Sequence, residues 1–182
     1  DLKTAYCTTT SCAATTITTV DSTNDVGKYT SLKIGSDGLP IIFYYLATSG
    51  DLIVTHCGTI TCASGNTRTV EITFEDVGKY SSVAILNRGE ESGLPIIIHY
   101  NTTNGDLMWA GPVAITGVGG ASNNLFETTN DVGKYNSVAI GPDGSPIVAY
   151  YDVTNANLRV AKCVGGGINN TICTDTIPPV FT

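Results

Sequence analysis

Three carboxylates recur in this chain inside one five-residue motif, Asp-Val-Gly-Lys-Tyr. The motif begins at Asp25, at Asp76 and at Asp131. Carboxylates that converge from several repeats could bind a cation or the hydroxyl groups of a sugar. The motif also suits a structural task, because an aspartate can accept hydrogen bonds from turn amides and a glycine can take a positive φ. We favour the structural interpretation, since a residue that returns in every copy usually does the same work in each.

Aromatic residues form a second set of candidates for sugar binding. Trp109 is the only tryptophan, and Tyr45, Tyr100 and Tyr151 each lie near the end of an apolar segment. Aromatic rings offer an apolar face with a polar edge, which suits the face of a sugar ring. The competing interpretation places these rings in the core with their hydroxyl groups at the rim. Carbohydrate binding is therefore the alternative function.

Residues suited to catalysis are few and scattered. The two histidines, His56 and His99, belong to different copies of the repeat. Glu90 and Glu91 could act as a glycosidase pair, but they lie in a turn that would hold them poorly. The nucleophile-elbow, zinc-protease and phosphate-loop motifs are absent. We expect no catalytic residue, no metal and no cofactor, with a propeller glycosidase or lyase as the enzymatic alternative.

The six cysteines fall into three local pairs, which are Cys7 with Cys12, Cys57 with Cys62, and Cys163 with Cys173. The copy of the repeat that lacks one member of the pair lacks both, having Pro112 and Gly117 instead, which favours disulfides over separate roles. Zinc ligation is the alternative, and it needs pairs from different repeats to converge. Disulfides indicate an oxidising compartment.

Two patterns for N-linked glycosylation occur, at Asn101 and at Asn169. Both are expected in turns or loops, where a glycan could point outward.

The motif marks a repeat of about fifty residues, which is typical of propellers and strand arrays. Tyr29 and Tyr80 are 51 residues apart, as are Pro95 and Pro146. We divide the chain, as a single repeat domain of residues 1–182, into a half repeat (1–24) and three repeats (25–75, 76–130 and 131–182).

The sequence pattern of each repeat predicts four antiparallel strands. The first, such as residues 80–86, alternates apolar and polar side chains. An Asp-Gly turn follows at Gly38 and Gly144, and the second strand is apolar throughout, so both of its faces must be covered. The fourth is rich in threonine and suits an outer edge. This pattern predicts an all-β fold of four-stranded blades, β-propeller-like, with an open β-array or a sandwich as the alternatives.

Composition narrows the partners and the location. The net charge is −7, and only 14% of residues are charged. Nucleic-acid binding rests on clustered Lys and Arg, and nine scattered basic residues argue against it. No apolar run is long enough to span a bilayer. A surface of threonine, serine, asparagine and glycine is typical of extracellular β proteins.

Two consecutive segments carry a family resemblance. Residues 37–45 read Asp-Gly-Leu-Pro-Ile-Ile-Phe-Tyr-Tyr, and residues 50–57 read Gly-Asp-Leu-Ile-Val-Thr-His-Cys. Residues 140–152 form the closest further copy. Together they resemble a repeat that is abundant in secreted bacterial proteins. The resemblance implies an exported, propeller-like repeat protein, and it transfers no catalytic residue.

The sequence predicts an extracellular structural or adhesive protein. We expect it to associate with itself head-to-tail through its terminal half repeats, forming a filament or a ring, because an open stack of blades leaves apolar faces at its ends. Glycans are the other expected partners.

Overall fold

The computed structural model describes residues 1–72, 75–111, 124–164 and 172–177. These residues form strands, turns and one short 3₁₀ helix, η1 (Gly89–Glu91). The strands are β1 (Leu2–Cys7), β2 (Thr15–Asp21), β3 (Val26–Ile34), β4 (Pro40–Leu46), β5 (Asp51–His56), β6 (Thr67–Ile72), β7 (Val77–Ile85), β8 (Pro95–Asn101), β9 (Asp106–Ala110), β10 (Asn124–Glu127), β11 (Val132–Ile140), β12 (Pro146–Asp152), β13 (Asn157–Val164) and β14 (Ile172–Ile177).

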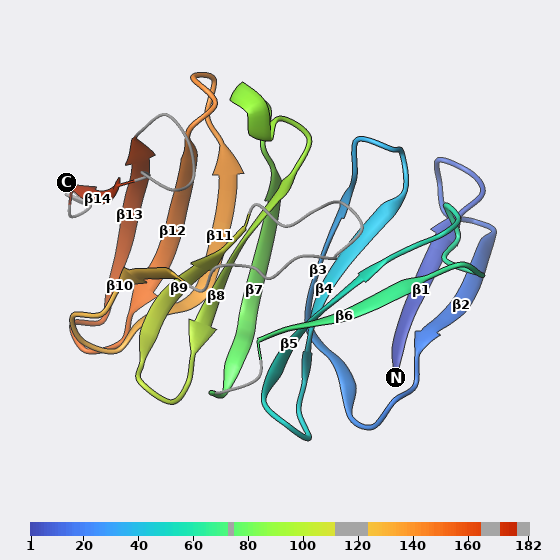
Figure 1. Cartoon of the computed structure of the whole chain (residues 1–182), viewed down its shortest axis with the longest axis horizontal. Helices are drawn as coiled ribbons and strands as arrows, with labels where there is room; N and C mark the ends of the chain where they lie inside the picture. Colours follow the sequence, from blue (N-terminus) through green and yellow to red (C-terminus); the bar gives the residue numbers. More distant parts are fainter. Residues whose placement is uncertain (73–74, 112–123, 165–171, 178–182) are drawn as a thin grey trace.

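Three antiparallel four-stranded sheets follow one another along the chain. Their strand orders are β3-β4-β5-β6, β7-β8-β9-β10 and β11-β12-β13-β14, and β1 with β2 forms a two-stranded sheet. Figure 1 shows the sheets side by side in a row, with the two termini at opposite ends. The all-β prediction with four-stranded blades is confirmed. The blades form an open array, and no described sheet closes into a barrel.

The second strand of a sheet is buried on both faces when neighbouring sheets flank it on both sides. Every residue of β4 and of β8 is buried, whereas buried and half-buried residues alternate along β12. Successive side chains of a strand point to opposite faces. Ile41 and Phe43 of β4 accordingly pack in one core cluster with residues of β7, and Ile42 and Tyr44 pack in another with Leu2 of β1. The cores therefore lie between sheets.

The first strand of each sheet is bulged at the recurring motif. In β3 the pairing register with β4 shifts between Val26 and Lys28 and again between Lys28 and Ser31. Gly27 has φ +94° and Tyr29 has φ +51°, values in the left-handed region. The same two shifts occur in β7 and in β11. A bulge bends a strand and re-aims its side chains, and here it aims the motif at the neighbouring sheet.

Candidate functional site: the joint between repeats

The carboxylate of Asp76 joins repeat 2 to repeat 1. The Tyr45 hydroxyl, at the end of β4, donates to Asp76 Oδ1 at 2.6 Å, and Lys79 Nζ donates to Oδ2 at 2.7 Å. Lys79 Nζ also lies 5.1 Å from the centroid of the Tyr45 ring. Burial, followed by the hydrogen bond to the Asp76 carboxylate, raises the pKa of Tyr45. The tyrosine therefore keeps its proton and remains the donor.

Repeats 2 and 3 meet through the same three groups. Tyr100 donates to Asp131 Oδ1 at 2.7 Å, and Lys134 Nζ lies 2.9 Å from Oδ2. Burial alone would raise the pKa of Asp131, but the hydrogen bonds from Lys134 and Tyr100 outweigh it and lower that pKa. The joint is thus a repeated unit of tyrosine, carboxylate and lysine.

The tyrosines of the motif stack along the row. The ring centroids of Tyr29 and Tyr80 are 4.9 Å apart, and those of Tyr80 and Tyr135 are 4.7 Å apart, with tilted planes. Such distances are within the favourable range for aromatic pairs. Each motif therefore contacts the motifs of the neighbouring repeats directly.

A serine on the first strand of each of repeats 1 and 2 accepts a hydrogen bond from a backbone N–H of the next repeat. The Val83 backbone N–H donates to Ser31 Oγ at 3.0 Å, and the Val138 N–H donates to Ser82 Oγ at 3.0 Å. These bonds occupy outward-facing amides of the first strands, which are edge strands. An edge amide that is paired is not available for pairing with another chain.

The motif glycine lets the neighbouring strand approach closely. A Cβ placed on Gly78 would lie 2.9 Å from Leu52 Cβ, and one on Gly133 would lie 2.9 Å from Leu107 Cα. Both leucines are fully buried, and each is the second residue of the third strand of the preceding repeat. The glycine thus meets two demands at once, a left-handed φ and absence of a side chain.

A buried acid lies at the junction of the half repeat and repeat 1. Asp21, at the end of β2, accepts hydrogen bonds from the Tyr44 hydroxyl and from Arg68 Nε, each at 2.7 Å, and from the Thr23 N–H at 2.8 Å. Burial alone would raise the pKa of Asp21, but these hydrogen bonds lower it to about 2. The acid is therefore a carboxylate at neutral pH.

A similar cluster, with its arginine on a third strand (β13) instead of a fourth strand (β6), occurs at the junction of repeats 2 and 3. There Glu127, at the end of β10, accepts from the Tyr150 hydroxyl and from Arg159. At the intervening junction His99 stands in the tyrosine position and is fully buried.

Replacing Asp21 by Asn is expected to destabilise the fold by about 2 kcal/mol at pH 6, because Arg68 loses the charge that compensates it. The loss depends on pH. Asp21 has a folded pKa of about 2 against 3.8 ordinarily, so its contribution is complete above pH 3.8 and disappears as the pH falls toward 2. That contribution is about 2 kcal/mol. Urea unfolding of both proteins at pH 6 and pH 2 measures it, and a difference that does not shrink in acid would contradict it.

The two described disulfides close identical loops in different surroundings. Cys7 pairs with Cys12, and Cys57 pairs with Cys62, each across a sequence separation of 5. Cys57 and Cys62 belong to a buried core cluster. These two pairs confirm the predicted disulfides there. Cys163 is also disulfide-bonded, and the strand register places it opposite Cys173, whose side chain lies outside the described residues.

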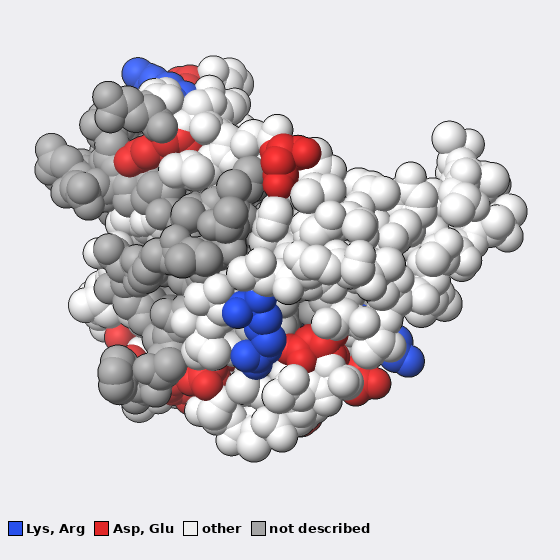
Figure 2. Space-filling model, turned by 45° about the vertical axis from the view of Figure 1, so that its right-hand side comes forward, with Lys and Arg blue, Asp and Glu red and all other residues white. Residues whose placement is uncertain are grey.

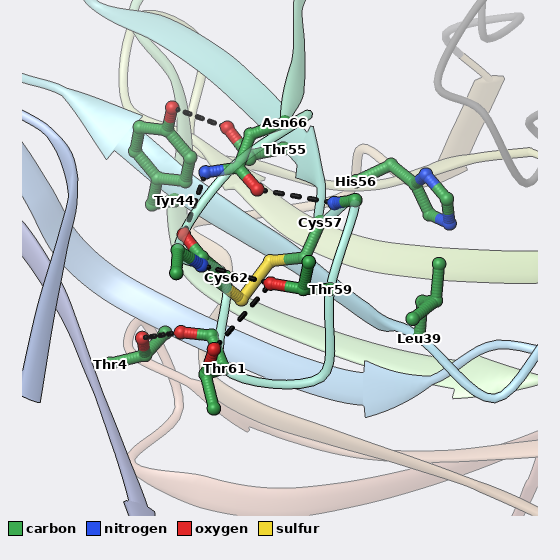
Figure 3. Close-up of a disulfide and its surroundings, with 12 residues drawn as sticks. Thr4, Leu39, Tyr44, Thr55, His56, Cys57, Thr59, Thr61, Cys62 and Asn66 are labelled. Carbon is green, nitrogen blue, oxygen red and sulfur yellow. Dashed lines mark hydrogen bonds between the residues drawn. A yellow bond between two sulfur atoms is a disulfide. The ribbon is translucent and has the colours of Figure 1, made fainter. Parts of the chain in front are cut away.

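Threonine and asparagine side chains hold the Cys57–Cys62 loop (Figure 3). Asn66 accepts from the Gly58 N–H and donates to the Cys62 carbonyl at 2.9 Å. The Thr4 hydroxyl of β1 donates to the Thr61 carbonyl at 3.4 Å. The loop thereby contacts the half repeat.

The three motif carboxylates belong to different repeats and have separate partners, so they do not converge. Asp25 contacts Lys28 Nζ at 2.6 Å, and its side chain is 57% exposed. The side chains of Asp76 and Asp131 bind tyrosine and lysine rather than turn amides. Within the described residues no group of three His, Cys, Asp or Glu side chains could hold a metal ion.

Most rings predicted to bind sugar lie in the core. Trp109, Tyr45 and Tyr100 are buried, and Tyr151 is half-buried. The three buried rings of Trp109, Tyr45 and Tyr100 therefore offer no open face to a glycan. Among the described tyrosines the most exposed ring is instead that of Tyr135, at 71%, followed by those of Tyr6 and Tyr29, each at 39%.

The prediction that Asn101 points outward is wrong. Asn101 is the last residue of β8 and is fully buried. Its amide nitrogen donates to Glu75, and its oxygen accepts from the Thr103 N–H at 2.9 Å. A glycan on that nitrogen would have to replace these contacts. Asn169 lies outside the described residues.

The histidines have no common site. His56 Nε2 lies 2.7 Å from Asp37 Oδ2 at one end of a sheet, and His99 is buried within β8.

Comparisons of the chain with protein-family models and with curated proteins find no match. Across the described ranges, no helix has the length and apolar character needed to cross a membrane.

Replacing Asp76 by Asn is expected to cost about 1 kcal/mol, because a charged acceptor shared by Tyr45 and Lys79 becomes neutral. The matched control is Asp25→Asn, because the only described side-chain contact of Asp25 is an exposed ion pair. Such pairs contribute about 0–1 kcal/mol, so the control should lie at the low end of that range. Guanidinium unfolding of the two variants provides the comparison, and equal losses would show that the tyrosine bond contributes nothing.

Proposed function

We propose that the chain is an extracellular structural or adhesive β-repeat protein that associates head-to-tail through the two ends of its row of repeats. One observation carries the proposal. Each end of the row presents one member of the tyrosine–aspartate pair that joins the repeats internally. Asp25 at one end is the counterpart of Asp76 and Asp131. Tyr151 at the other end is the counterpart of Tyr45 and Tyr100.

Apolar exposure at the two ends supports the same proposal. Leu158 is 44% exposed, whereas its counterparts Leu52 and Leu107 are fully buried. Leu32 is 46% exposed, whereas its counterpart Val83 is 1% exposed. Uncovered apolar faces at the ends of a repeat array favour association. Because the two end surfaces differ, their contact is heterologous, and it produces a ring or a filament.

The extracellular location is supported by the disulfides and by the surface. Disulfides persist in oxidising compartments. Figure 2 shows a face on which charged side chains form a few separate groups within a wide uncharged area. A wide uncharged area of this kind suits close packing between copies.

Light scattering under non-reducing conditions, combined with negative-stain electron microscopy, tests the proposal. We expect the mass to rise with concentration in multiples of 19.0 kDa, and filaments or rings to appear. A monodisperse monomer at every concentration would overturn the head-to-tail proposal.

A further inference from the structure

The half repeat already occupies the position of the third and fourth strands of a repeat. A Cβ on Gly27 would lie 3.0 Å from Leu2 Cα, and one on Gly78 would lie 3.0 Å from Leu52 Cα. β1 therefore stands over repeat 1 as β5 stands over repeat 2. A complete repeat docking on repeat 1 would compete with β1 for this place, whereas the first two strands of a repeat would not.

The position that those first two strands would fill is open. Leu32 and Ile34 of β3 are 46% and 48% exposed, and among the described strands β1 pairs with β2 alone. We name this surface, made of the outward side of β3 and the free edge of β1, the β3 slot. Its equivalent on repeat 2 is filled by the hairpin β3–β4, and its equivalent on repeat 3 by β7–β8.

The polar groups of the β3 slot define what fits. In repeats 2 and 3 the motif aspartate accepts from a tyrosine, and an outward amide donates to a serine. In repeat 1 the corresponding groups are the Asp25 carboxylate and the Leu32 N–H, and no serine or tyrosine bond to them occurs within the described part of the chain. The Tyr29 ring, 39% exposed, adds one face for aromatic stacking. The slot is complementary to a β-hairpin with a serine on its first strand and a tyrosine near the end of its second.

The hairpin β11–β12 carries these groups in the required places. Ser137 and Tyr151 are the counterparts of Ser82 and Tyr100, which already bind the next repeat. Tyr135 of β11 is 71% exposed. The other two hairpins use their serine and tyrosine within the chain.

We propose that the β3 slot is a strand-complementation site that takes the β11–β12 hairpin of a second copy of this chain. This inference rests on the proposed head-to-tail association and specifies its contact. The Tyr151 hydroxyl of one copy would donate to the Asp25 carboxylate of the next, and the Leu32 N–H would donate to the Ser137 oxygen.

Pairing of β12 with β1 requires an exchange, because β13 holds that edge of β12 in the single chain. In the assembly β1 and β2 replace β13 and β14 beside β12, forming a composite four-stranded sheet from two copies. The exchange gives up the β12–β13 ladder, the Arg159–Glu127 ion pair and the core contacts of Ala161. It gains the β12–β1 ladder and the joint contacts at Asp25, Leu32 and Ile34, which must outweigh these losses. Exchange of equivalent elements between copies is a low-cost route to association.

The first test measures self-association of the full chain by analytical ultracentrifugation. Leu32→Lys with Ile34→Lys should weaken association about a hundredfold, and Asp25→Asn about tenfold. The matched control is Val70→Lys with Leu125→Lys, two exposed positions on outer strands of internal repeats, which should leave association unchanged. If the β3 substitutions leave self-association unchanged, the β3 slot is not the contact, whereas the proposed function remains supported.

The second test uses a synthetic peptide of residues 131–152, with a Ser137→Ala, Tyr151→Phe peptide as control. The unmodified peptide should bind the full chain, perturb the amide signals of Asp25 and Leu32, and block self-association, while the control binds at least about tenfold more weakly. Absence of binding would overturn the slot. Binding by a chain that never self-associates would overturn the second copy as occupant, together with the proposed function.

Hydrogen exchange distinguishes the exchange from simple end-to-end stacking. On association the amides of β3 should gain protection, and those of β13 that face β12 should lose it. Gain at β3 with no loss at β13 would overturn the strand-pair arrangement.

Discussion

Replacing Gly78 by Ala should destabilise the protein by about 4 kcal/mol. At φ +94° an alanine meets left-handed strain of about 1–2 kcal/mol. Its Cβ would also lie 2.9 Å from Leu52 Cβ and 3.0 Å from Leu52 Cα, an overlap that costs about 1–3 kcal/mol. Because Leu52 begins a strand of the neighbouring repeat, relief would require the two sheets to separate. Urea unfolding monitored by circular dichroism measures the loss.

Gly38→Ala separates the two contributions. Gly38 has φ +80°, and a Cβ there meets nothing within 4 Å. This control should lose only the conformational part, about 1–2 kcal/mol. Equal losses at Gly38 and Gly78 would show that close approach of the repeats adds nothing. Gly133→Ala, which faces Leu107 in the same way, should repeat the Gly78 result.

Removing the Cys57–Cys62 disulfide should cost about 3–4 kcal/mol. For two cysteines 5 positions apart, loop closure accounts for about 2 kcal/mol. The double variant Cys57→Ala, Cys62→Ala also withdraws two buried sulfur atoms from a core cluster, which adds about 1–2 kcal/mol.

The Cys7–Cys12 pair is the matched control, since its loop has the same length. Cys7 is half-buried and Cys12 is exposed, so its double alanine variant should lose only the loop-closure part, about 2 kcal/mol. Thermal unfolding of the two double variants gives the comparison. A larger loss from the Cys7–Cys12 pair would contradict the assignment of the difference to burial.

The strand pattern of each repeat could be predicted because it follows from local chemistry. The apolar second strands and the Asp-Gly turns indicated four-stranded sheets, and β4 and β8 are buried on both faces as that pattern requires. The residue at which the first strand begins was harder to predict from the sequence. The expected strand from residue 80 begins at Val77, because a bulge with left-handed Gly78 and Tyr80 carries the pairing through the motif.

The joint could be predicted only in part, because it depends on contacts between residues far apart in sequence. The recurrence of Asp76 and Tyr45 marked both residues, but nothing local indicated that the two bind each other across 31 positions. The acids Asp21 and Glu127 were missed. Each lies four residues before a motif aspartate, and that constant offset was the available signal.

Burial explains the failed expectations for Trp109 and Asn101. Asn101 was expected in a turn and Trp109 on a third strand, but both belong to strands that neighbouring sheets cover. A single sequence does not reveal which side of a strand another repeat will cover. The sugar platform and the outward glycan were inferred without that information.

The tyrosine–aspartate bonds between repeats both run in one sense, from the hydroxyl of Tyr45 or Tyr100 to the carboxylate that follows it in the chain. The row of repeats therefore has a direction, with the carboxylate member of the pair at one end and the tyrosine hydroxyl at the other. Two copies meeting at their carboxylate ends would bring like charges together with no proton to share. Any fibre of this protein should consequently have a direction, with a different rate of growth at each tip.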